Sequence, residues 1–220
     1  MVLALHGLIS VSPDADQMGV YWVTTIHSGE IMSVLQSWVF RLAALLFISV
    51  NSAHAATLLQ ECNGEAAQIN QSAPQVIDRI NLVSNKARKS GVPVIFVQHE
   101  GQSGYLSHGS REWQLADGLV NEAKDMRIRK TTPDAFLRTD LQQRLDALGV
   151  QELVIGGMHS EFCVDTTTRR ALALGYPVIL LEDAHTSAGN AALTAEQVIA
   201  HHNATLTNIS SFGPRARTVC

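Results

Sequence analysis

The chain has 220 residues, of which 46% are hydrophobic and 16% are charged, and its formal net charge is -4 at pH 7. This length suits one domain with some additional sequence, because single domains typically span about 100–200 residues. The chain is weakly acidic and lacks the excess of basic residues that nucleic-acid binding usually requires, so we expect no nucleic-acid partner.

Residues 1–56 differ in pattern from the rest of the chain and are predicted to form a poorly structured extension. Within residues 32–55, Arg41 precedes a short apolar run that ends in the sequence NSAHAA. A polar lead, about ten apolar residues and an exit of small residues are the parts of a secretory signal peptide. The run is too short for a membrane-spanning helix, which needs about 20 residues.

The same run has a second interpretation, as the first buried strand of the domain. A short apolar run such as ALLFISV (44–50) cannot be assigned by its periodicity alone. The signal interpretation predicts an exported protein that begins near Ala56 and has no membrane segment in its mature form. The strand interpretation predicts a cytoplasmic protein, and both stay open on the sequence.

From residue 73 onward, helical and strand patterns alternate. Pro74 lies near the start and Gly91 just past the end of a predicted helix of about four turns. Its apolar face consists of Val76, Ile80, Val83 and Ala87. The sequence VPVIFVQ (92–98) is rich in β-branched residues and typical of a strand covered on both faces, and a short strand is predicted near 127–130.

The second half of the chain repeats this alternation. A helical face over 141–148 precedes the strand ELVIGG (152–157). A helix over about 162–174 then precedes the strand YPVILL (176–181).

A last helix is predicted to open with a capping box. Thr194 and Gln197 have the required spacing, and the helical pattern continues to about residue 203. Because strands alternate with helices, we predict a single α/β domain over 57–220, with a parallel sheet flanked by helices on both faces.

Cys163 lies where a parallel sheet has its reactive crevice, at the carboxyl ends of the strands. The strand ELVIGG ends at Gly157, and Cys163 opens the helix that follows. The unpaired N–H groups of a first helical turn favour a thiolate and suit a developing oxyanion. We therefore predict that Cys163 is a nucleophile; the alternative is a buried, unreactive thiol.

Lys130 is the predicted companion of this thiol. It ends the sequence MRIRK and precedes Thr131, so it lies where a strand gives way to a turn. A neighbouring ammonium lowers the pKa of a thiol and stabilises anionic intermediates. The alternative is a lysine exposed to solvent at the end of a strand.

Neither disulfides nor metals are expected to support the site. The three cysteines, at positions 62, 163 and 220, are too few and too widely spaced for a disulfide framework. The nine histidines are scattered, and no His-x-x-x-His or Cys-x-x-Cys spacing typical of a zinc site is present. We therefore expect no metal and no cofactor.

The residues around Cys163 read GGMHSEFCVDTTTRRALALGYPVILLEDAHTS (156–187). This segment resembles the nucleophile segment of the isochorismatase-like cysteine hydrolases, whose pattern is Glu, an aromatic residue, Cys and Val, followed by Asp-Thr-Thr. RKTTPDAF (129–136) is similar to the lysine segment of that family, and VPVIFVQHE (92–100) to its second strand. The resemblance covers about residues 74–214 and implies a three-layer α/β/α fold.

The resemblance also implies an Asp, Lys and Cys triad, in which Cys163 takes the nucleophile role and Lys130 the lysine role. It further implies a cis peptide bond between Met158 and His159. The backbone N–H groups of His159 and Cys163 would then form the oxyanion hole. In this interpretation His159 contributes its backbone, while its imidazole can simply face solvent.

The family's aspartate should end the first strand, and this chain has no aspartate there. The two candidate strands place Ser49 or Glu61 at or near that position. A serine cannot act as a carboxylate base, and counting back from the first helix favours the strand that contains Glu61. Glu61 is therefore the candidate base; without a base, the protein would be a catalytically impaired binding or oligomeric scaffold.

The activity that the resemblance implies is hydrolysis of a small amide or related C–N acyl substrate through a thioester. Nicotinamidases of the superfamily carry Asp-x-His after the second strand, whereas this chain has QHEGQSGYLSH (98–108), so nicotinamide is disfavoured. Cys163 weighs against isochorismate, which members without an active nucleophile process. The expected partners are a small-molecule substrate and further copies of the chain, because family members commonly form homo-oligomers.

Overall fold

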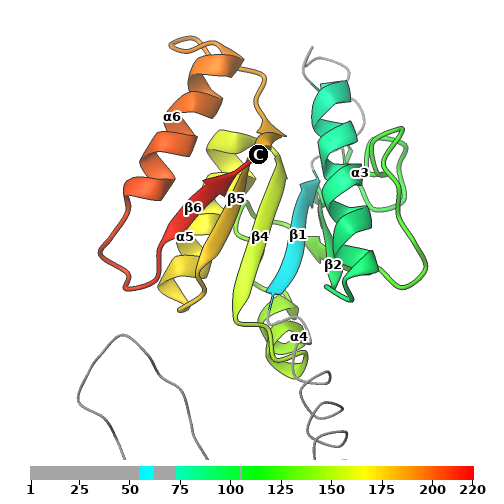
Figure 1. The fold of residues 1–220 in the computed structure, drawn as a ribbon. Coiled ribbons are helices and arrows are strands. Elements are labelled where there is room, and N and C mark those ends of the chain that lie inside the picture. The colour runs from blue at the N-terminus through cyan, green and yellow to red at the C-terminus, as the bar shows by residue number, and fades with distance from the viewer. Residues whose placement is uncertain (1–54, 62–72, 105) are drawn as a thin grey trace, which may run out of the picture. The chain divides into compact units, whose positions relative to one another are not determined.

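The computed structural model describes residues 55–61, 73–104 and 106–220. These residues build a six-stranded sheet with helices packed against it (Figure 1). The strands are β1 (Ala55–Glu61), β2 (Val94–His99), β3 (Met126–Lys130), β4 (Glu152–Met158), β5 (Val178–Thr186) and β6 (Ala216–Val219). The helices are α3 (Ala73–Lys89), α4 (Leu141–Ala147), α5 (Asp165–Ala173) and α6 (Ala195–Asn208), and a π-helical turn, η1 (Ser160–Val164), joins β4 to α5.

The strands lie in the order β3-β2-β1-β4-β5-β6, and every neighbouring pair is parallel. The described strands therefore run from the middle of the sheet to one edge, return to the middle and continue to the other edge. The direction changes between β1 and β4. In such sheets, ligands bind outside the carboxyl ends of the strands at this point.

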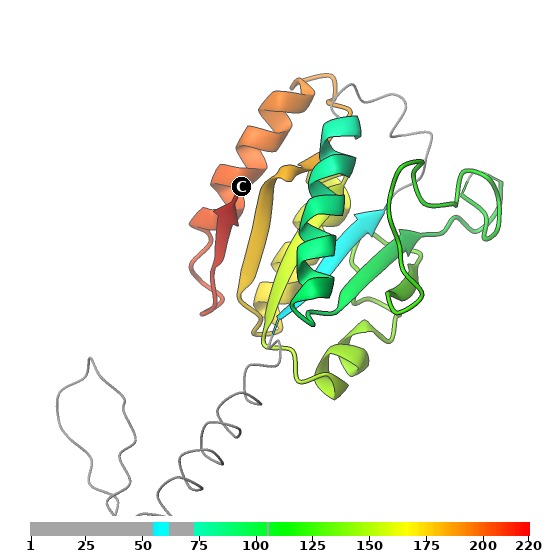
Figure 2. The same ribbon diagram turned by 45° about the vertical axis from the view of Figure 1, so that its right-hand side comes forward.

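Helices cover both faces of the sheet, as Figure 2 shows. On each face, an apolar core fills the space between the sheet and its helices. Under α3, the core includes Leu59, Val76, Ile80, Phe96 and Leu181. Under α4, α5 and α6, the core includes Leu58, Val97, Ile128, Leu145, Ile155, Ala171 and Leu206. The alternation of side chains along each strand feeds both cores. The predicted parallel sheet with helices on both faces is confirmed.

Most predicted elements are present with small shifts in their ends. The capping box of α6 is formed, since Gln197 N donates to Thr194 Oγ1 and Thr194 N donates to Gln197 Oε1. The strand predicted over 176–181 continues to Thr186 as β5. The strand β6 was not predicted.

The first strand, β1, begins at Ala55 and fills the centre of the sheet between β2 and β4. It therefore starts two residues before the domain boundary expected at position 57. Ala56 is fully buried in the core. The apolar run over 44–50, with Ser49, and the predicted signal segment up to residue 54 lie outside the described residues.

No helix among the described residues is long and apolar enough to cross a membrane.

Candidate active site

The carboxyl ends of β3, β2, β1 and β4 lie in this order across the part of the sheet that includes the switch point. The backbone of Glu61 in β1 is in register with Gln98 of β2, and His99 of β2 is in register with Lys130 of β3. On the other side of β1, Gln60 is in register with Gly157, one residue before β4 ends. The strands that end at Lys130 and at Glu61, and the strand that leads to Cys163, thus end on the same side of the sheet.

The turn that carries Cys163 starts from two glycines that the fold requires. A Cβ on Gly156 would lie 2.8 Å from the carbonyl oxygen of Ala184, so no side chain fits there. Gly157 has a φ of 114°, a conformation that other residues rarely adopt. A cis peptide bond follows between Met158 and His159, where the resemblance places one.

Cys163 lies in the π-helical turn η1, between the cis bond and α5. The carbonyl oxygen of His159 accepts hydrogen bonds from the backbone N–H groups of Phe162 (3.2 Å) and Val164 (3.1 Å), and these bonds close the turn. Cys163 is a thiol and is 4% exposed. The sequence pattern predicted an ordinary first helical turn; the chain instead widens to a π-helical turn before α5 begins at Asp165.

Lys130 is buried, with only 1% of its surface exposed, so it is not a solvated lysine at a strand end. Its Nζ donates a hydrogen bond to the carbonyl oxygen of Pro133 at 2.9 Å. The same oxygen accepts a bond from Thr167 Oγ1 at 3.2 Å, and Thr167 Oγ1 accepts one from the N–H of Ala135 at 3.1 Å. These bonds fasten the lysine segment to the helix that follows Cys163.

The candidate base, Glu61, is described only as the last residue of β1. Along β1, Leu58 belongs to the core under α5, and Leu59 belongs to the core under α3. Since strand positions alternate between faces, position 60 falls on the α5 face and position 61 on the α3 face. Ile128, two residues before Lys130, also belongs to the core on the α5 face, so the lysine position shares the face of Gln60.

His159 differs from its expected solvent-facing role. Its imidazole is partly buried, and Nδ1 is buried without a hydrogen-bond partner among the described residues. The exposed ring of Phe162 packs edge-on against it, with 6.0 Å between the ring centroids. The imidazole is therefore partly buried beside the aromatic neighbour of Cys163.

A buried polar network behind η1 was missed on the sequence. Ser160 Oγ lies 2.7 Å from His185 Nδ1, and His185 Nε2 lies 2.9 Å from Asn203 Oδ1. Beside it, Ser187 Oγ donates to Glu161 Oε1 at 2.8 Å. The strand predicted over 176–181 stops before the polar sequence EDAHTS (182–187), whereas β5 continues through most of it, and this sequence supplies His185 and Ser187.

Desolvation by burial lowers the pKa of His185, although its bond to Asn203 opposes this shift. The histidine is 1% exposed. A neutral imidazole is therefore favoured inside the protein.

Among the described residues, no group of three or more His, Cys, Asp and Glu side chains could hold a metal ion.

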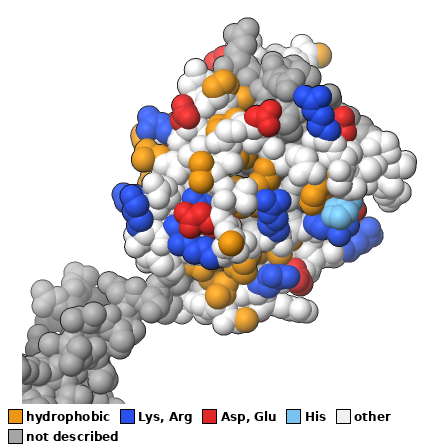
Figure 3. Space-filling model, turned by 90° about the vertical axis from the view of Figure 1, so that its right-hand side faces the viewer, with side chains coloured by type: hydrophobic (Ala, Val, Ile, Leu, Met, Phe, Trp, Pro, Cys, Tyr) orange, Lys and Arg blue, Asp and Glu red, His pale blue; other side chains and the backbone are white. Residues whose placement is uncertain are grey.

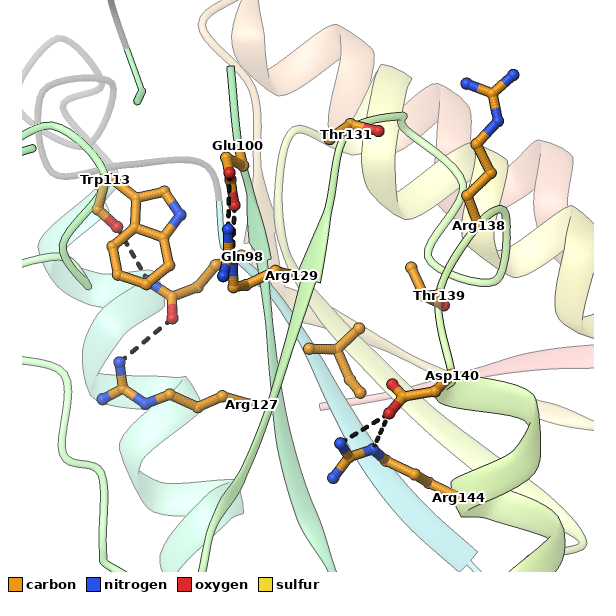
Figure 4. Close-up of a pocket in the computed structure, with 11 residues that line it drawn as sticks. Gln98, Glu100, Trp113, Arg127, Arg129, Thr131, Arg138, Thr139, Asp140 and Arg144 are labelled. Carbon is orange, nitrogen blue, oxygen red and sulfur yellow. Dashed lines mark hydrogen bonds and ion pairs between the residues drawn. The ribbon is translucent and has the colours of Figure 1, made fainter. Parts of the chain in front are cut away.

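A groove of about 560 Å³ lies along the outer edge of β3 and is lined by neither Cys163 nor Lys130 (Figure 4). Two of its arginines are neutralised locally, Arg129 by Glu100 at 2.6 Å and Arg144 by Asp140 at 2.7 Å. Hydrogen bonds from these arginines lower the pKa of both carboxyl groups. The groove is separate from the predicted nucleophile.

Charges on the face shown in Figure 3 are mixed, with acidic and basic side chains interspersed.

A second cavity, of about 20 Å³, lies beside Met158 on the α3 side. It has room for about one water molecule and is too small for a substrate. Neither cavity therefore replaces the strand ends as the candidate site.

Residues 43–211 match the family model described as the isochorismatase domain. Streptothricin hydrolase from Streptomyces noursei is 38% identical over 114 residues, which are 51% of this chain and 41% of that protein. The chain thus spans less than half of that relative. A probable inactive nicotinamidase from Arabidopsis thaliana is 30% identical over 176 residues, which are 71% of this chain and 85% of that protein.

A crystal structure of an isochorismatase family protein has the same architecture. It is 35% identical, its TM-score is 0.69, and the match covers 77% of this chain and 99% of that one.

Proposed function

The chain belongs to the isochorismatase family, and we propose that it hydrolyses a small amide or related C–N acyl substrate, with Cys163 as the nucleophile. The observation that carries the proposal is the position of this thiol. It follows the cis bond at the end of β4, at the switch point of the sheet, in a turn that leads into α5, and α5 is hydrogen-bonded to the segment of Lys130. Thiols in such turns are suited to attack a carbonyl carbon.

In the proposed reaction, the thiolate of Cys163 adds to the substrate's carbonyl carbon. The negative charge that develops on the carbonyl oxygen is stabilised by the backbone N–H groups of His159 and Cys163. The C–N bond then breaks, the leaving amine takes up the proton that the base removed from the Cys163 thiol, and a thioester remains. Water attacks the thioester, which releases the acid and returns the thiol.

Lys130 contributes a positive charge in this proposal. An ammonium near a thiol favours its ionised form and stabilises anionic intermediates. Burial of a lysine is costly, and a charged side chain is normally buried only where it has partners. The hydrogen bond to Pro133 supplies one such partner and fixes the direction of the side chain.

The base is the part of this arrangement that departs from the family pattern, which has an aspartate. We propose Glu61 for this role, because it is the only acid in β1 and stands at the carboxyl end of that strand. Position 60, which falls on the face of Lys130 by strand alternation, is a glutamine and cannot accept a proton at neutral pH. Separate substitutions at positions 60 and 61 show which of the two is needed for turnover.

A catalytically silent scaffold is the second candidate function. The glutamine at position 60 favours it, as does the similarity to a relative named as a probable inactive nicotinamidase. In this case the chain would keep the fold and bind a small molecule or further copies of itself. A homo-oligomer is proposed under either function, and light scattering at micromolar concentration tests it.

The experiment that tests the leading proposal is a screen of small amides with the wild-type protein and Cys163→Ala. Product formation by the wild type alone, with a transient mass increase on Cys163, supports the hydrolase. Absence of turnover together with an unreactive thiol supports the scaffold.

A further inference from the structure

The turn that carries Cys163 is held against β5 by two pairs of side chains. Ser160, the first residue of η1, contacts His185, and Glu161 accepts a hydrogen bond from Ser187. Both partners come from the end of β5 and the residue after it. The position of the turn therefore depends on β5 as well as on its own backbone bonds.

The network behind Ser160 has a defined direction. Asn203 Nδ2 donates to the carbonyl oxygen of Glu182 at 3.1 Å, so the amide oxygen of Asn203 faces His185 Nε2. An amide oxygen only accepts, so Nε2 must carry the proton of the imidazole. Nδ1 of His185 is then an acceptor, and the hydroxyl of Ser160 donates to it.

We propose that Ser160, His185 and Asn203 are positioning residues, which hold the turn from the cis bond to Cys163 in its catalytic geometry. The proposal rests on the proposed function. Oxyanion stabilisation requires the N–H groups of the turn to be preorganised, and a shift of about 1 Å can reduce a rate about a hundredfold. A hydroxyl held by a directed hydrogen bond restrains the turn at its first residue.

The three side chains have the order of a hydrolytic triad, namely hydroxyl, imidazole and amide. Their burial excludes this role, because Ser160 is 0% exposed and His185 is 1% exposed. The hydroxyl of Ser160 lies inside the protein and cannot meet a carbonyl carbon. Cys163 retains 4% exposure and is slightly less buried than either residue.

The direction of this network depends on the charge of His185. Facing it are Ser160 and Glu161 of η1, Asp183 of β5, and His202 and Asn203 of α6. Burial, the largest influence, lowers the pKa of His185 and keeps it neutral. If acid protonates Nδ1, that atom becomes a donor, and the hydroxyl of Ser160 can no longer donate to it.

The pH effect has a defined sign. Because the pKa of His185 is lowered in the folded protein, the stabilisation that neutral His185 gives the folded state is complete above the ordinary pKa of histidine. It is lost as the pH falls through the lowered value. Activity should therefore decline on the acid side as the turn loses its restraint.

The test compares Ser160→Ala, Ser160→Thr and His185→Asn with the control His201→Gln, which changes an exposed histidine of α6. On an amide found in the screen, Ser160→Ala should lower kcat about 10- to 100-fold while KM changes less than about threefold. Alkylation of Cys163 by iodoacetamide should change less than about threefold, because alkylation forms no oxyanion. Ser160→Thr retains the hydroxyl and should restore most of kcat.

His185→Asn places an amide oxygen near the position of Nδ1 and does not titrate. It should keep more activity than Ser160→Ala, and the decline of kcat on the acid side should flatten. A folded Ser160→Ala variant with kcat within about twofold of wild type would overturn the proposal.

Failure of the proposed function is recognised separately. If no amide is turned over, nitrogen-15 NMR of labelled histidine still tests the network. The proposal predicts one buried neutral histidine with its proton on Nε2, whose Nδ1 signal shifts in Ser160→Ala. The proposal would be refuted if His185 were charged at neutral pH, or if its neutral form carried the proton on Nδ1.

Discussion

Lys130 and Thr167 donate hydrogen bonds to the same oxygen, the carbonyl of Pro133, at 2.9 and 3.2 Å. Thr167 lies four residues after Cys163, about one helical turn along the chain. The shared acceptor therefore couples the predicted cation to the helix that follows the predicted nucleophile. Although the two residues are 37 positions apart, this loop fixes their relative placement.

Thr167→Val should loosen this coupling while keeping the shape of the side chain. The hydroxyl of Thr167 also accepts from the backbone N–H of Ala135, so its removal leaves a buried donor unsatisfied. We expect a loss of about 1–3 kcal/mol in the free energy of unfolding, measured with urea, and a lower kcat. Thr167→Ser keeps the hydroxyl and should lose less of both. Equal effects of the two variants would contradict the role of the hydroxyl.

Lys130→Met should preserve the fold, because replacement of a buried charge by an apolar side chain of similar volume is often tolerated. Loss of the charge should raise the pKa of the Cys163 thiol and lower turnover. The measurement is the pH dependence of the rate at which iodoacetamide alkylates Cys163. Lys124→Met, which changes a lysine whose side chain is 60% exposed, is the control. An unchanged profile in Lys130→Met would remove Lys130 from the site.

Glu61→Gln and Gln60→Glu test the base. If Glu61 is the base, Glu61→Gln should lower kcat by about 100-fold or more, in the range of general acid–base contributions. If a base can act only from position 60, which shares the face of Lys130, Gln60→Glu should raise turnover and Glu61→Gln should change it little. Both variants are compared by kcat at several pH values. Retained activity in Glu61→Gln would eliminate Glu61 as the base.

The order of strands and helices was predictable because each element has its own periodicity and end signals. Cys163 and Lys130 could be found because strand ends converge in a parallel sheet. The network of Ser160, His185 and Asn203 could not be found, since its bonds join residues 18 and 25 positions apart. Nor could the face of Glu61 be assigned until the core partners of Leu58 and Leu59 were known.

Tyr176 provides a pH test of the packing between α4 and the segment that precedes β5. Burial, followed by its hydrogen bond to Asp146, raises its pKa to about 12. A raised pKa means that the stabilisation is complete below the ordinary value of about 10 and is lost as the pH rises towards 12. We expect one tyrosine to titrate late in the phenolate absorbance of the folded protein. That late step should be missing in Tyr176→Phe, and its persistence would assign it to another tyrosine.

The measurement that tests the central claim most directly is peptide mapping of the native protein after brief exposure to iodoacetamide, together with amide turnover by Cys163→Ala. The hydrogen bond to Glu182 raises the pKa of the exposed Cys220 and slows its reaction, which makes it an internal control. We predict that Cys163 is alkylated faster than Cys220 near neutral pH, and that alkylation and the alanine substitution each abolish turnover. Turnover that survives in Cys163→Ala would contradict the account.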